Sequence, residues 1–258
     1  MLTPPANSSV SGALQAACND RAISVFEVSL PRVSCAAMDL VDELRAGARW
    51  TQSHGEEVAN SVSHGLGLLA AAIGTPILLR AAAERGSGPF FIGSCIFAAT
   101  VLLLYLGSAI YHLWPRTHFK GALQVIDHSA IFLLIAGTYT PFSLGPLYGP
   151  WGWSILGLVW PLAVFGVILK TAKGAHHRPR LAVCLYLAMG WLIMVAIRPL
   201  SLAVSLATLI WLVAGGLVYT AGVLFFINDH KRYCHFIWHL FVLGGTGCHY
   251  FAVLSCAG

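Results

Sequence analysis

The chain has 258 residues, of which 57% are hydrophobic and only 10% charged, against about a quarter charged in soluble domains. So few charges cannot cover the surface of an ordinary soluble protein, and the composition instead indicates a surface that faces lipid. The formal net charge of +5 is divided among short connections between apolar stretches, so we expect no nucleic-acid partner.

The first 50 residues differ from the rest of the chain. They mix Pro, Ser and charged residues, and we interpret residues 1–50 as a disordered tail. Within it, Met38, Val41 and Leu44 share one side of a short amphipathic helix predicted for residues 38–50. We expect residues 51–258 to form a single membrane domain.

Seven apolar stretches follow, each long enough to cross a bilayer. A helix rises about 1.5 Å per residue, so about 20 residues span the hydrocarbon core. The pattern predicts an all-α integral membrane protein built as a seven-helix bundle, with Gly and Pro, among them Pro199, in the connections. The predicted spans are residues 58–80, 90–112, 124–144, 151–170, 181–198, 202–226 and 235–256.

The loop charges predict an orientation. The second, fourth and sixth loops together carry eight Lys and Arg residues, whereas the odd-numbered loops carry three. By the positive-inside rule, the even-numbered loops and the N-terminus lie in the cytoplasm, and the C-terminus lies outside.

Polar residues that are costly in lipid gather at one predicted depth. Burying an ionisable group in a membrane is unfavourable, so each such residue needs a partner. All of them fall at or near the predicted cytoplasmic end of their spans. They are Glu57, Asn60 and His64 in the first span, Ser108 and His112 in the second, Asp127 and His128 in the third, and His235 and His239 in the seventh.

Three of these histidines suggest a metal site. His235 and His239 are four residues apart, so they point the same way from one helix, and His112 would complete a group of three. Three protein ligands with a fourth position open is typical of catalytic zinc, although imidazole also suits Cu, Fe and Ni. Asp127 could be a ligand or hold a bound water. The alternative is that the histidines bond to backbone or to lipid headgroups at the interface.

The polar residues of the first span share one helix face. Their spacing of three and four residues brings Glu57, Asn60 and His64 together. We expect them to cap the helix and form hydrogen bonds between helices, in support of the site, rather than to take a direct chemical role.

The motifs together resemble the progestin and adipoQ receptor family, and most of all its bacterial-type branch, the hemolysin III proteins. The resemblance lies in Glu57-x-x-Asn60-x-x-x-His64, in Ser108-x-x-x-His112 followed by Asp127, and in His235-x-x-x-His239. The stretches at 137–142 and 235–254 are also similar, and the resemblance covers about residues 55–256.

The resemblance implies a zinc ion held by His112, His235 and His239, with Asp127 reaching it through water and Ser108 close by. It also implies seven helices with a cytoplasmic N-terminus. The wider group contains alkaline ceramidases, so we expect a zinc-dependent hydrolase of lipid amides, with membrane lipids as partners and a ceramide-like substrate. We expect it in the inner membrane of a bacterium. Two alternatives stay open: a receptor or sensor of membrane state with structural zinc, and a pore-forming cytolysin.

Overall fold

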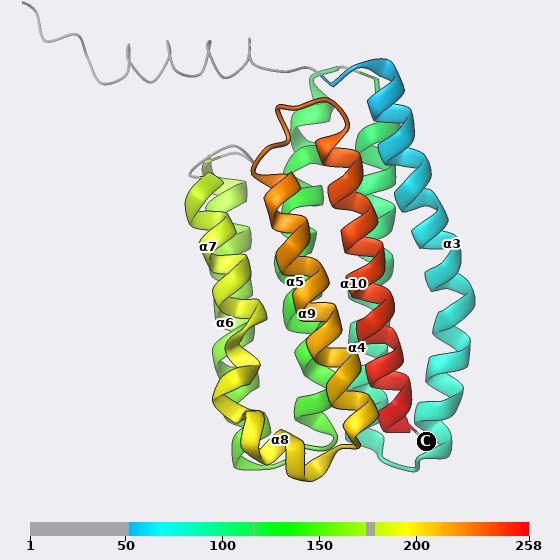
Figure 1. Ribbon diagram of the computed structural model, residues 1–258, viewed down its shortest axis with the longest axis vertical. Helices are drawn as coiled ribbons and strands as arrows, with labels where there is room; N and C mark the ends of the chain where they lie inside the picture. The colour runs from blue at the N-terminus through cyan, green and yellow to red at the C-terminus, as the bar shows by residue number, and fades with distance from the viewer. Residues whose placement is uncertain (1–51, 116, 174–178, 258) are drawn as a thin grey trace, which may run out of the picture. The chain divides into compact units, whose positions relative to one another are not determined.

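The computed structural model describes residues 52–115, 117–173 and 179–257 (Figure 1). The predicted tail, including the amphipathic helix at 38–50, lies outside these residues. Within them the regular structure is helical, with no strand, and seven helical segments are long and apolar enough to cross a membrane. The predicted all-α, seven-helix fold is therefore confirmed.

Six of the seven spans are continuous helices, and all of these except the sixth span run somewhat beyond their predicted limits. The first illustrates why: Ser53 and Glu56 form a capping box, which starts the helix at His54, before the apolar stretch begins. The helices are α3 (His54–Glu84), α4 (Gly88–Leu113), α5 (Phe119–Leu144), α6 (Pro150–Lys173), α9 (Leu206–Phe226) and α10 (Cys234–Ala257).

The fifth span is broken, and the prediction of one helix over 181–198 is wrong in this respect. It consists of α7 (Pro179–Gly190), the 3-10 segment η1 (Leu192–Ala196) and α8 (Ile197–Ala203). Pro199 does not separate two spans but lies in the first turn of α8, where a missing N–H costs little. The next span consequently starts at Leu206 rather than at 202, behind the N-cap Ser205.

One side chain from α5 satisfies the backbone at this break. The Tyr139 hydroxyl accepts a hydrogen bond from the Ile193 N–H at 2.9 Å. It also lies 2.7 Å from the Met189 carbonyl oxygen and 2.9 Å from that of Gly190, and donates its one proton to these acceptors. In hydrocarbon an unpaired backbone group is costly, so this buried phenol stabilises the interruption.

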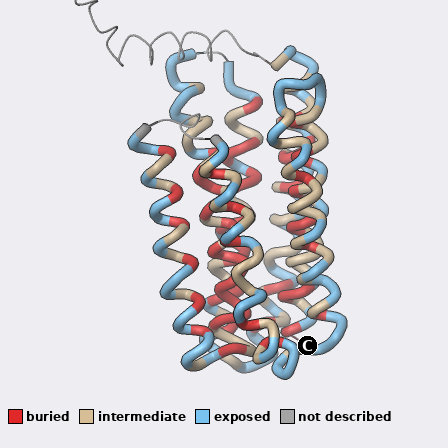
Figure 2. Tube along the Cα trace, turned by 60° about the vertical axis from the view of Figure 1, so that its left-hand side comes forward, coloured by how far each residue is buried: buried red, intermediate tan, exposed pale blue. Residues whose placement is uncertain are grey.

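The helices pack so that three distant segments meet at one end of the bundle. Helix α3 packs against α4 and α10, while α4 packs against α5 and α9 against α10. Figure 2 shows buried residues along the inward sides of the helices. The start of α3, the end of α4 and the start of α10 lie together at the end opposite the C-terminus (Figure 1). That this end is cytoplasmic remains a prediction from the loop charges.

Candidate metal centre

The three predicted histidine ligands converge. His112 lies in the last turn of α4, and His235 and His239 lie one turn apart at the start of α10. One ring nitrogen from each can be chosen so that all three lie within 4.8 Å of one another. All three side chains are buried, with His239 only 1% exposed. This group could hold a metal ion.

The ring nitrogens fit such an ion. Nε2 of His112 and both ring nitrogens of His235 are buried and have no hydrogen-bond partner among the described residues. Leaving a buried polar atom unsatisfied costs about 1–3 kcal/mol, so three such atoms in one place require an explanation. A single cation takes one nitrogen from each ring, so it would satisfy Nε2 of His112 and one of the two nitrogens of His235.

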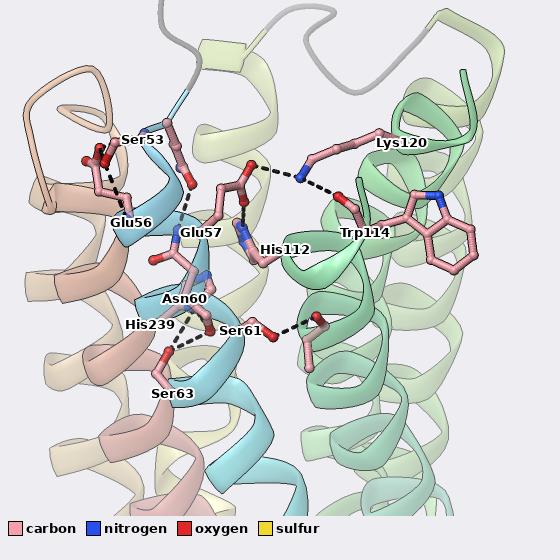
Figure 3. A network of polar contacts seen from close by, with 12 residues as sticks. Ser53, Glu56, Glu57, Asn60, Ser61, Ser63, His112, Trp114, Lys120 and His239 are labelled. Atoms are coloured by element: carbon pink, nitrogen blue, oxygen red, sulfur yellow. Dashed lines mark hydrogen bonds and ion pairs between the residues drawn. The ribbon is translucent and has the colours of Figure 1, made fainter. Parts of the chain in front are cut away.

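The remaining nitrogen of His112 is held by α3. Its Nδ1 lies 2.7 Å from Oε2 of Glu57, and the other carboxylate oxygen lies 2.8 Å from Nζ of Lys120 (Figure 3). A carboxylate accepts hydrogen bonds, so Nδ1 of His112 is the donor, and in the neutral ring the lone pair is then on Nε2. Carboxylates placed in this way behind a metal-binding histidine fix the tautomer and the ring orientation.

His239 is held in the same way, but by different atoms. Its Nδ1 lies 3.2 Å from the Asn60 carbonyl oxygen and 3.2 Å from Oγ of Ser63. The carbonyl accepts, so Nδ1–H donates and Nε2 keeps its lone pair. The Asn60 side chain instead donates to Gln52, at 2.6 Å. Asn60 therefore contacts His239 through its backbone.

Sequence reasoning missed Ser63 and used Lys120 only as a loop charge. Ser63 lies three residues after Asn60, and its hydroxyl also donates to the Asn60 carbonyl at 2.8 Å. The helical spacing from Asn60 was the available signal. For Lys120 no comparable signal exists, because its partners lie on other helices.

His64 lies beside the three histidines. Its ring stacks on that of His239, with centroids 3.7 Å apart and planes 7° from parallel. It is 3% exposed, and neither ring nitrogen has a hydrogen-bond partner among the described residues. The side chain thus packs against a candidate ligand and reaches the cavity described next.

Asp127 and Ser108 are buried near the histidines. Asp127 lines a small cavity of about 10 Å³ together with His64, His235 and His239, which is room for about one water molecule. Ser108 lies one turn before His112 on α4 and is fully buried, and its hydroxyl faces the Asp127 carboxylate. The structure therefore brings a carboxylate and a hydroxyl to the end of the bundle that holds the histidines.

These features define an integral, multipass membrane protein with a buried three-histidine group. The Haemolysin-III related family matches residues 52–250. The chain is 42% identical to the "Hemolysin-3 homolog" of Bacillus subtilis (strain 168), over 77% of this chain and 93% of that protein. It is 39% identical to "Hemolysin-3" of Bacillus cereus, over 80% and 94% of the two chains. The chain belongs to the Haemolysin-III related family, which confirms the resemblance inferred from its motifs.

A more distant relative links the chain to the wider receptor family. The "Monocyte to macrophage differentiation factor" of Homo sapiens is 26% identical over 218 residues, which cover 81% of this chain and 87% of that protein. No solved structure matches the chain significantly.

Proposed function

We propose that this protein is a zinc-dependent hydrolase that cleaves lipid amides, with a ceramide-like substrate, in the inner membrane of a bacterium. The observation that carries the proposal is the buried group of His112, His235 and His239, with ring nitrogens free to bind a metal and the Asp127 carboxylate in the adjoining cavity. The Bacillus relatives support a bacterial membrane.

His112, His235 and His239 would hold the metal, each through a ring nitrogen. Three neutral imidazoles suit zinc, and three protein ligands leave a position open for chemistry. When bound, zinc acts as a Lewis acid, which polarises a carbonyl and lowers the pKa of a water molecule to about 7. Glu57 and the Asn60 carbonyl orient two of the rings through Nδ1.

Asp127 would transfer the proton, and Ser108 would stabilise the negative charge. In the proposed reaction, the Asp127 carboxylate takes a proton from the attacking water and passes it to the departing amine. The Ser108 hydroxyl donates a hydrogen bond to the carbonyl oxygen as negative charge develops there. The hydroxyl is fully buried and faces the Asp127 carboxylate, so both groups lie on the same side of the histidines.

A second, larger cavity supports a lipid substrate. It has a volume of about 90 Å³ and lies between α4, α5, α7, α9 and α10. The two cavities share Leu104, Ile131, Trp238 and Val242 in their walls, so they adjoin. An apolar chain fits such a lining, and its polar head would then lie at the histidines.

The test uses the full-length protein purified in detergent and supplied with zinc and a long-chain ceramide. Free fatty acid should be released, and Asp127→Asn should lower the rate by about 100-fold or more while the zinc content stays unchanged, because a general base is removed but not a ligand. Glu84→Gln, which alters an exposed carboxylate at the far end of α3, is the matched control. Zinc-loaded protein that releases no fatty acid would contradict the proposal.

The tightness of the smaller cavity favours a second candidate, a sensor of membrane state in which zinc only joins the helices. Room for one water leaves little space for a scissile amide unless side chains move. Under this candidate, chelation lowers the melting temperature sharply and turnover is absent. Leakage of a dye from vesicles that contain only this protein would instead indicate the pore-forming alternative.

A further inference from the structure

Lys120 makes three contacts where α3, α4 and α5 meet. Its Nζ lies 2.8 Å from Oε1 of Glu57 and 3.1 Å from the Trp114 carbonyl oxygen (Figure 3). The ammonium also lies 5.0 Å from the centre of the Tyr111 ring. The side chain is only 15% exposed, so these contacts are largely shielded from water.

The two oxygens of the Glu57 carboxylate have different partners. One oxygen accepts a hydrogen bond from the Lys120 ammonium, and the other accepts one from Nδ1–H of His112, at 2.7 Å. With both oxygens engaged, the carboxylate cannot rotate away from the histidine. A carboxylate that is only 15% exposed would also bear an uncompensated desolvation cost without a cation. Lys120 therefore affects both the orientation and the charge balance of the Glu57 carboxylate, which in turn contacts His112.

We propose that Lys120 is a positioning residue that sets the metal affinity of the three-histidine group by acting through Glu57. The inference rests on the metal-binding part of the proposed function and is independent of lipid hydrolysis.

The surroundings of Lys120 strengthen this role. Trp114 is the C-cap residue of α4, and a cation at a helix C-terminus is favourable. Tyr111 precedes His112 in the chain, and the two rings lie 4.6 Å apart. Lys120 thus fixes the turn of α4 that carries His112, as well as the carboxylate that orients it.

The test measures zinc affinity of the full chain in detergent by competition with a chelating dye. Lys120→Met should weaken zinc binding by about tenfold, the lower end of the range for loss of an outer partner of a ligand. Lys120→Arg, which keeps the charge and the donors, should restore most of the affinity. Lys231→Met is the matched control, since this exposed lysine lies in the loop before α10. Unchanged affinity in Lys120→Met would overturn the proposal.

A double-mutant cycle separates positioning from a merely structural contact. If Lys120 acts through Glu57, Lys120→Met should weaken binding by less than about twofold in a Glu57→Gln background. Equal losses in both backgrounds would overturn the proposal.

Cobalt(II) gives a second readout, because its absorption spectrum reports the ligand geometry. The spectrum should change in Lys120→Met and return in Lys120→Arg; a spectrum identical to wild type in Lys120→Met would count against the role. If zinc affinity falls as expected but no lipid amide is cleaved, the hydrolase proposal fails and this one stands.

Discussion

The two ends of α4 direct their buried polar groups differently. Towards its start the helix buries Phe90 and Gly93, which pack against apolar neighbours and the backbone of α5, and Ser94, whose hydroxyl donates to the Phe90 carbonyl of the same helix. Towards its end it buries Ser108 and His112, whose polar atoms face other helices. One helix thus serves two purposes: at one end its contacts hold the bundle together, and at the other they hold a group of histidines. Substitutions at the two ends should therefore have separable effects on stability and on metal binding.

The largest effect is expected at the polar end. His239→Ala removes one of three ligands and should weaken zinc binding by more than about 100-fold, beyond the range typical of outer partners. Elemental analysis of the purified protein, beside a variant that lacks all three histidines, measures this. His249→Ala on the same helix is a useful control, since this residue lies about 15 Å further along α10. Zinc retained in His239→Ala would place the metal elsewhere.

The second effect belongs to the apolar end. A Cβ added at Gly93 would lie 2.7 Å from Cα of Pro141 on α5, so the two backbones must separate. Gly93→Ala should therefore destabilise the protein by about 1–3 kcal/mol, as overpacking does, and leave zinc affinity unchanged. Thermal unfolding in detergent checks the first part and dye competition the second.

The matched glycine for this experiment is Gly157, inside α6, where an added Cβ meets nothing within 4 Å. Gly157→Ala should leave the melting temperature unchanged or raise it. A loss of zinc in Gly93→Ala as large as in His239→Ala would show that the two ends of α4 are coupled.

The smallest effect concerns one hydrogen bond. Ser63→Ala removes one of the two partners of His239 Nδ1 but leaves the Asn60 carbonyl in place. A net hydrogen bond contributes about 0.5–1.5 kcal/mol, which corresponds to a two- to tenfold loss of zinc affinity. Ser61→Ala is the control, because that hydroxyl donates to the Ala109 carbonyl and not to a histidine (Figure 3). Equal zinc affinities of the two variants would show that Ser63 does not contribute to metal binding.

The sequence predicts the features that repeat along one helix. Hydropathy identifies seven spans, and the spacing of His235 and His239 places both on one side of α10. The common depth of His112 and these two residues follows from the span boundaries and from the alternating direction of successive spans. These inferences need only the pattern within each helix and the order of the spans, and for that reason they are accessible without a structure.

Contacts between helices were not accessible in this way. The contact between Lys120 and Glu57 joins residues 63 positions apart, and no periodicity reports it. The break after Gly190 also escaped prediction, because its sequence is as apolar as a continuous span and the stabilising residue, Tyr139, lies on α5. The prediction placed the interruption at Pro199. This residue lies in the first turn of α8, where a proline ring fits without strain.

Tyr139 also has a consequence for the space inside the bundle. Tyr139, Gly190 and Trp191 all line the larger apolar cavity. The Tyr139 hydroxyl reaches from α5 to the backbone where α7 ends and η1 begins. The hydrogen bonds of the Tyr139 hydroxyl therefore tie α5 to the interrupted span in the wall of this cavity, and a ligand that pushes the two apart must break these bonds.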